Sequence, residues 1–169
     1  HALKHKDRRV SMPQSSALVE HGDNTECHAY IALGGNVARE GRSVTQTLEA
    51  ALAALEGDGV HVAVRSAWYA TPAYPAGSGP DFVNAAAQLE TDLDAAALLA
   101  RLHAAEAALG RVRGGRWEPR VCDLDLVAMG NTILPDLETV RRWMAMDLGT
   151  AQRVWPERLI LPHPRMQER

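Results

Sequence analysis

The sequence predicts one α+β domain, and three features of the chain support that prediction. Its 169 residues are 46% hydrophobic, which is enough to bury one substantial core. Apolar residues recur with period two in some segments and at helical spacing in others. The two kinds of segment follow one another in the order strand, helix, strand, strand, helix, strand. This order predicts one antiparallel sheet with both helices on one face.

The first half of the domain is expected to hold a strand, a helix and a second strand. Residues 29–36, AYIALGGN, predict a short buried strand that ends in a glycine turn. The helix after it is ended by GDG at 57–59 and has its apolar positions at Val44, Leu48, Ala51, Leu52 and Leu55. Residues 60–70 alternate with period two, which predicts one strand with Val60, Val62 and Val64 on one face and His61, Ala63 and Arg65 on the other.

The second half repeats this pattern after a loop at 70–81 that is rich in Pro and Gly. Residues 82–91 are a plausible strand. A helix is expected from about Asp94 to Gly110, with an apolar stripe of Leu98, Leu102, Ala105 and Leu109. A last strand covers 121–129. The resulting βαββαβ order is that of the ferredoxin-like fold. Residues 1–28 are polar and aperiodic, and are expected to be a disordered arm or a segment foreign to the natural chain.

The composition excludes several function classes. Lys4 and Lys6 are the only lysines, so 18 − 2 = 16 of the basic residues are arginines. No Walker-A lysine, kinase strand lysine or Schiff-base lysine is therefore available in the body of the chain. The net charge of −3 argues against broad nucleic-acid binding. Cys27 and Cys122 have no metal-ligand spacing, and no apolar run is long enough to span a bilayer. A cytoplasmic location is expected.

The last predicted strand carries two aspartates within an apolar run, VCDLDLVAM. Side chains two residues apart in a strand point the same way, so Asp123 and Asp125 are expected to project together from the face opposite Cys122, Leu124, Leu126 and Ala128. Two carboxylates at this separation can bridge a pair of divalent cations. All-oxygen ligation suits Mg²⁺, which shares its remaining positions with water and phosphate.

Four arginines precede this strand between residues 111 and 120, namely Arg111, Arg113, Arg116 and Arg120. Guanidinium groups bind phosphate oxygens bidentately and stay charged. Taken alone, the aspartates could equally be solvated carboxylates paired with arginine, and the arginines could be a surface or nucleic-acid contact. The two features together favour a magnesium–phosphate site of the kind that serves phosphoryl transfer.

Four further residues are candidates with two interpretations each. Glu106, inside the apolar stripe of the second helix, could orient an arginine or pair at the helix edge. Trp117 could anchor the arginine loop or cover a planar ligand. Phe82 shares a strand face with Asn84, whose carboxamide could pair with a heterocycle, although a lone Phe is more often core. His163 could donate to phosphate or lie in a surface turn.

These residues occur in motifs that closely resemble the 6-hydroxymethyl-7,8-dihydropterin pyrophosphokinase family of folate biosynthesis. The matching segments are YIALGGN (30–36), YATPAYP…GPDFVNAA (69–86), E…LGRVRGGRWEPRVCDLDL (106–126) and LPHPR (161–165). They appear in the family's order, and the RW-x-PR-x-x-DLDL run is long and particular. The resemblance covers residues 29–134 and 159–169, and residues 135–158 are an apparent insertion in which 137–148 could form a short helix.

The resemblance implies transfer of the β,γ-diphosphate of ATP to the pterin hydroxymethyl group, with release of AMP. It implies that Asp123 and Asp125 hold two Mg²⁺ ions and that Arg111 and Arg120 are catalytic. The implied pterin contacts are Thr71, Pro72, Phe82, Asn84 and Trp117. The implied ATP contacts are Glu106, Arg111, Arg113, Arg120, His163 and Arg169. ATP and the hydroxymethyl pterin are the expected partners of a monomer, with neither nucleic acid nor membrane.

The sequence departs from the family at several places. Glu118 stands where the family usually has Gly, the arginine loop is slightly short, and the sequence stops at Arg169 where the family continues with a Phe. Phe82 is the only Phe, so a second stacking ring is missing and weaker pterin binding is expected if the chain ends there. A second hypothesis is therefore a pterin- or nucleotide-binding protein with impaired catalysis. A third, a ferredoxin-like RNA-binding domain, is weakened by the scarcity of aromatic residues.

Overall fold

The computed structural model describes residues 27–39, 41–73, 77, 79–110, 120–151, 153–154 and 156–166. They form an α+β fold with one five-stranded sheet, whose neighbouring strands all run antiparallel. The strands are β1 (Cys27–Gly35), β2 (Val60–Arg65), β3 (Tyr69–Thr71), β4 (Phe82–Thr91) and β5 (Asp123–Met129). The order across the sheet is β2-β4-β1-β5, and the short β3 pairs with β4. The predicted α+β class and antiparallel sheet are confirmed.

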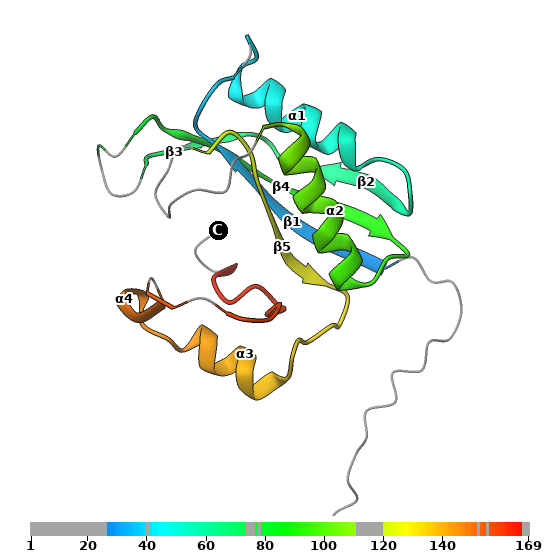
Figure 1. Cartoon of the computed structure of the whole chain (residues 1–169), viewed down its shortest axis with the longest axis vertical. Coiled ribbons are helices and arrows are strands. Elements are labelled where there is room, and N and C mark those ends of the chain that lie inside the picture. Colours follow the sequence, from blue (N-terminus) through cyan, green and yellow to red (C-terminus); the bar gives the residue numbers. More distant parts are fainter. Residues whose placement is uncertain are drawn as a thin grey trace, which may run out of the picture.

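The helices α1 (Val44–Leu55) and α2 (Ala95–Ala108) cover one face of the sheet (Figure 1). Each begins at a side chain that caps its first turn. Ser43 accepts from the N–H of Gln46, whose side chain accepts from the N–H of Ser43, which is a capping box. Asp94 accepts from the N–H of Ala97. The helix boundaries expected from the apolar spacing are confirmed, since GDG follows α1 and Gly110 follows α2.

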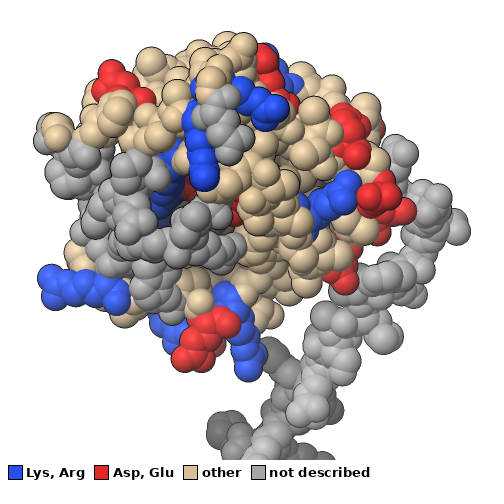
Figure 2. Space-filling view, turned by 45° about the horizontal axis from the view of Figure 1, so that its top comes forward, with Lys and Arg blue, Asp and Glu red and all other residues tan. Residues whose placement is uncertain are grey.

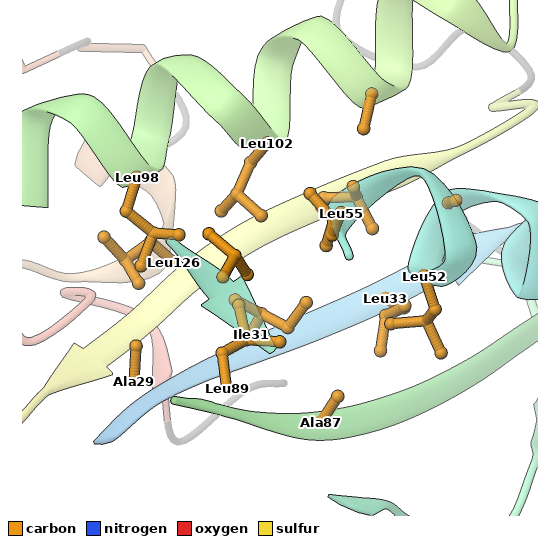
Figure 3. Close-up of a cluster of buried hydrophobic side chains, with 14 of the residues drawn as sticks. Ala29, Ile31, Leu33, Leu52, Leu55, Ala87, Leu89, Leu98, Leu102 and Leu126 are labelled. Atoms are coloured by element: carbon orange, nitrogen blue, oxygen red, sulfur yellow. The ribbon is translucent and has the colours of Figure 1, made fainter. Parts of the chain in front are cut away.

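The core lies between these two helices and the sheet, as Figure 3 shows. Three strands contribute buried rows of residues from their inner face, and one such row is Leu33 of β1, Ala85 of β4 and Leu124 of β5. Leu98 and Leu102 of α2 are fully buried against them. Burial of a leucine side chain contributes about 1.5–3 kcal/mol to folding, so this layer fixes which face of each strand turns outward. The outer face holds the candidate site.

Two β-bulges change the faces that period-two counting predicts. In β5, Ala128 pairs with Tyr30 and Leu126 with Ile31, so Val127 is an extra residue. Beyond it Met129 is buried, whereas Ala128 lies on the outer face with the half-exposed Tyr30. The prediction that Ala128 faces the core was wrong, because an extra residue in a strand moves everything after it to the other face.

The predicted strand at 60–70 is two strands. A register shift at Ala63 turns Val64 outward, where it is 59% exposed, so the prediction that it shares a face with Val60 and Val62 was wrong. The N–H of Ser66 then donates a backbone hydrogen bond to the Ala86 carbonyl at 2.9 Å. The side chain of Ser66 also accepts from the N–H of Ala86. This local hydrogen bonding ends β2, and the chain pairs again with β4 only at Tyr69.

The described residues between 131 and 166 lie on the β5 side of the sheet, away from α1 (Figure 1). They include the helices α3 (Leu137–Met144) and α4 (Leu148–Ala151). The segment returns to the domain through a bridge between Leu134 and Leu161 and a hydrogen bond from the N–H of His163 to the Val127 carbonyl. At the start of α3 the Asp136 carboxylate caps the helix, and the hydrogen bond from the N–H of Thr139 lowers the pKa of Asp136. Among the helices of the described ranges, none has the length and hydrophobicity needed to span a bilayer.

Candidate active site

The candidate site lies on the outer face of the sheet, at the end where β1 finishes and β4 and β5 begin. One transverse row runs from Tyr69 on β3 through Asn84 on β4 and Gly34 on β1 to Asp123 on β5. Residues directly opposite one another in a ladder point to the same face. The side chains of Asn84 and Asp123 therefore lie on one face, separated by two strand spacings, or about 10 Å.

The next row holds the second aspartate. Asp125 pairs with Ala32, and Ala32 pairs with Ala86. Gly34 and Ala32 on β1 thus stand between the two aspartates and the Asn84 side of the face, and neither carries a large side chain. The prediction that Asp123 and Asp125 project together, opposite Leu124 and Leu126, is consistent with this pairing, since both leucines are buried in the core.

Asp123 differs from Asp125 in burial and in its partner. Asp123 is 7% exposed, and its Oδ2 accepts a hydrogen bond from Nη1 of Arg120 in a direct ion pair. Asp125 is only partly buried. A carboxylate this deep needs a hydrogen-bonded cation or a metal to offset its desolvation, and Arg120 supplies that charge here.

Glu106 on α2 supports the aspartates from below the sheet. It is 2% exposed, and its Oε1 accepts a 2.7 Å hydrogen bond from the N–H of Leu124. That N–H lies between the two aspartates in the chain. The two earlier interpretations, an arginine partner or a pair at the helix edge, did not include this contact with the β5 backbone. Glu106 therefore fixes the position of the strand that carries the carboxylates.

Three residues for which the family resemblance implies pterin contacts, Thr71, Phe82 and Asn84, lie at the other side of the face. Thr71 pairs with Phe82, and Asn84 lies two residues further along β4, so all three point outward. Nδ2 of Asn84 donates to Oγ1 of Thr71 at 2.7 Å. Pro72 follows directly and is exposed. The shared face predicted for Phe82 and Asn84 is thus part of a small polar and aromatic group.

Each residue of the GGN motif at 34–36 has a structural reason that was not expected from the sequence. The two glycines lie too close to neighbouring atoms to carry a side chain, and Asn36 makes hydrogen bonds to distant segments. A Cβ at Gly34 would lie 2.6 Å from Oδ1 of Asn84, and one at Gly35 would lie 2.8 Å from the Val121 carbonyl. Asn36, 7% exposed, accepts from the N–H of Arg120 at 2.9 Å and donates to the Pro80 carbonyl at 3.2 Å. The sequence signal that could have indicated this role of Asn36 was a polar residue directly after a glycine pair at the end of a strand.

His163 lies near β5 on the returning segment. Its backbone N–H is bound to Val127, and its Nδ1 accepts from the N–H of Arg165 at 3.2 Å. An imidazole whose Nδ1 accepts carries its proton on Nε2, which is a donor suited to phosphate. Arg111, Arg113, Trp117, Glu118 and Arg169 lie outside the described residues, so the roles predicted for them stay predictions.

On the face in Figure 2, arginine side chains are interspersed with Asp and Glu. The described residues contain no group of three His, Cys, Asp or Glu side chains placed to hold a metal. Paired carboxylates with an adjacent guanidinium, beside a hydrogen-bonding wall for a planar ligand, are the equipment of a phosphoryl-transfer enzyme.

Comparisons with known proteins identify the class more closely. The family model described as 7,8-dihydro-6-hydroxymethylpterin-pyrophosphokinase (HPPK) matches residues 30–169. Several relatives carry the name 2-amino-4-hydroxy-6-hydroxymethyldihydropteridine pyrophosphokinase. The chain is 36% identical to that of Methylorubrum extorquens, over 83% of this chain and 75% of the relative. The corresponding values are 34%, 83% and 74% for Haemophilus influenzae, and 32%, 83% and 71% for Bacillus subtilis.

The chain therefore belongs to the 7,8-dihydro-6-hydroxymethylpterin-pyrophosphokinase family. The family resemblance seen in the sequence motifs is confirmed. The hypothesis of a binding protein with impaired catalysis receives no support from these comparisons.

Proposed function

We propose that this protein transfers the β,γ-diphosphate of ATP to the hydroxymethyl group of 6-hydroxymethyl-7,8-dihydropterin and releases AMP, a step in folate biosynthesis. Family membership supports the pyrophosphokinase activity. The observation that carries the proposal is the arrangement of two groups of side chains on the outer face of the sheet. There Asn84, Phe82 and Thr71 stand on one side, and Asp123 and Asp125 stand about two strands away.

The pterin is assigned to the Asn84 side. A pterin ring presents adjacent donors and acceptors at its edge, and a carboxamide offers one of each. The bond between Asn84 and Thr71 holds that carboxamide in place before the ligand arrives. The missing side chain of Gly34 lets Oδ1 of Asn84 lie against the strand. Phe82 supplies an aromatic surface, and Trp117 is proposed as a second contact.

The two aspartates are proposed to hold two Mg²⁺ ions together with the ATP phosphates. The donor set fits this metal, since two carboxylates from one strand face provide oxygen ligands and leave most coordination positions to phosphate and water. When bound, Mg²⁺ would neutralise the charge of the phosphates and hold them in line. Glu106 keeps both carboxylates in register through the N–H of Leu124.

The arginines and His163 are proposed to hold the polyphosphate. Arg120 stands beside Asp123, so its guanidinium can pass from the carboxylate to a phosphate when ATP and metal arrive. Nε2–H of His163 is a further donor, and Arg111, Arg113 and Arg169 are assigned the same function by family resemblance. During transfer the pterin hydroxyl oxygen bonds to the β-phosphorus. The bond from that phosphorus to the oxygen shared with the α-phosphorus breaks, the hydroxyl proton is released, and AMP leaves.

The finer fold and assembly predictions belong to the same proposal. A ferredoxin-like arrangement is supported by the order β2-β4-β1-β5, with β3 as an addition to β4. A monomeric state and a cytoplasmic location stay predictions. Light scattering of the purified protein with and without ligands tests the first of them.

The test is a coupled assay of AMP formation. The purified protein should form AMP only when Mg²⁺, ATP and the hydroxymethyl pterin are all present, and each component is omitted in turn as a control. Excess chelator should stop the reaction, and added Mg²⁺ should restore it. Binding of both ligands without AMP formation would instead support the impaired-catalysis hypothesis.

A further inference from the structure

Two residues that follow β1, Asn36 and Arg39, contact the two residues on either side of positions 111–119, which belong to the arginine loop, here defined as residues 111–120. At its far end, Arg120 is held by Asn36, which donates its N–H to the Arg120 carbonyl and accepts the Arg120 N–H, both at 2.9 Å. At its near end, Nη1 of Arg39 donates to the carbonyl of Gly110 at 2.5 Å. Asn36 and Arg39 thus hold the chain directly before the loop and at its last residue.

The Arg39 guanidinium occupies the place of a side chain at Gly110. A Cβ at Gly110 would lie 2.5 Å from Nη1 of Arg39 and 2.9 Å from its Cζ. Gly110 also has φ +82, a conformation that side chains disfavour, as it closes α2 with a hydrogen bond to Ala107. Glycine is therefore required twice at this position, for the backbone and for the contact with Arg39.

The backbone of Arg39 is itself well anchored. The N–H of Arg42 donates to the Arg39 carbonyl at 3.0 Å and closes a turn, in which Gly41 has φ +75. The capping box of α1 begins at the next residue, Ser43. Asn36 fixes the same segment three residues earlier. Arg39 therefore reaches Gly110 from a firm base, although its own side chain is exposed.

The contact between Arg39 and Gly110 is electrostatically favourable. The carbonyl of Gly110 lies at the C-terminal end of α2, where the helix dipole favours a cation. A charged donor makes a stronger hydrogen bond than a neutral one. The carbonyl also belongs to the peptide bond that joins Gly110 to Arg111.

We propose that Arg39 is a positioning residue for diphosphate transfer: through Gly110 it sets the direction in which the chain enters the arginine loop. This role assigns Arg39 no contact with either substrate. The inference deepens the proposed function and depends on it. Arg111 and Arg120 are the first and last residues of this loop, and the proposed function assigns both to the phosphates. Small displacements of such groups reduce rate more than ground-state binding.

The test is steady-state kinetics of Arg39→Ala, Arg39→Lys and the parent protein. Arg39→Ala should lower kcat about tenfold while the KM values for Mg-ATP and pterin change less than about twofold. Arg39→Lys should recover part of the loss, because an ammonium can still donate to the carbonyl. The midpoint of thermal unfolding should stay within about 2 °C of the parent, as expected for a surface substitution.

Two matched controls separate positioning from general stability. Arg101→Ala removes another arginine contact of α2, the 3.2 Å ion pair with Asp58, and should leave kcat unchanged. Gly57 follows α1 with φ +87 and has open space around it, so Gly57→Ala carries the backbone cost alone. Gly110→Ala should lower kcat as Arg39→Ala does, and Gly57→Ala should not.

The outcomes are distinct from failure of the proposed function. If the parent protein forms no AMP, the proposed function fails. If the parent is active and Arg39→Ala retains its kcat, or loses it only in proportion to a loss of folded protein, the positioning role is overturned. An equal fall in kcat for Arg101→Ala would overturn it as well.

Discussion

Arg120 and Asp123 form a direct ion pair in the structure, three residues apart at the start of β5. The Asp123 side chain is 9% exposed and that of Arg120 is 34% exposed. The two groups therefore neutralise one another in the absence of ligands, although the proposed function assigns one to metal and the other to phosphate. Loading the site with Mg-ATP would exchange this pair for two new ones.

Arg120→Ala should reduce the rate of transfer more than the affinity for nucleotide. The guanidinium is proposed to meet charge that develops during transfer, and its loss also leaves Asp123 buried without its partner. The free energy of unfolding should fall by about 1–3 kcal/mol. Kinetics, nucleotide titration and urea unfolding measure the three quantities. A tenfold loss of ATP affinity with unchanged kcat would show that Arg120 serves ground-state binding only.

Asp123→Asn and Asp125→Asn should each lower Mg²⁺-dependent turnover at least about a hundredfold, because an amide is a poor ligand for a hard cation. Asp125→Asn should keep the parent's unfolding midpoint within about 2 °C, since Asp125 is only partly buried. Glu90→Gln is the matched control, as Glu90 is a carboxylate of β4 at the opposite end of the strand. Turnover of Asp125→Asn within about twofold of the parent would refute the metal assignment.

Gly34→Ala should weaken pterin binding about tenfold and leave Mg-ATP binding unchanged. The added Cβ would lie 2.6 Å from Oδ1 of Asn84, so the carboxamide must leave its position. Gly79→Ala is the control, because its Cβ would meet only Nδ2 of Asn36 at an ordinary 3.5 Å. Calorimetric titration with each ligand measures both affinities. Equal pterin affinity in Gly34→Ala and the parent would remove Asn84 from the pterin site.

Glu106→Ala should destabilise the fold by about 2–4 kcal/mol, since it leaves the buried N–H of Leu124 without its acceptor and opens a cavity. Glu106→Gln keeps an oxygen at this position and should lose less. Denaturant unfolding gives both values. If Glu106→Ala unfolds at the parent's denaturant concentration, the carboxylate does not hold β5 in place.

The elements and the core were predictable because their signals are local. Apolar spacing and helix-ending glycines gave both long helices, and the run from Phe82 to Thr91 gave β4. Alternation within β5 placed Asp123 and Asp125 on one face, since no bulge lies between them. The family motifs then supplied roles for residues whose chemistry alone left two interpretations open.

The bulges and the contacts between distant segments were not predictable in the same way. Nothing in the local sequence marks Ala63 or Val127 as the extra residue of a ladder, because a bulge depends on the partner strand. The contacts of Asn36 with Pro80 and Arg120 join segments 44 and 84 residues apart. Such contacts form only when the sheet is assembled. The GGN motif at 34–36 therefore indicated a turn but not the residues that Asn36 contacts.

Phosphorus NMR of the reaction products tests the central claim, diphosphate transfer, most directly. ATP and 6-hydroxymethyl-7,8-dihydropterin are incubated with the protein and Mg²⁺, and the phosphorus atoms of each product are followed. The account predicts AMP together with a pterin ester that carries two coupled phosphorus atoms, in equal amounts. Formation of ADP with a pterin monophosphate, or release of free phosphate with the pterin unchanged, would contradict it.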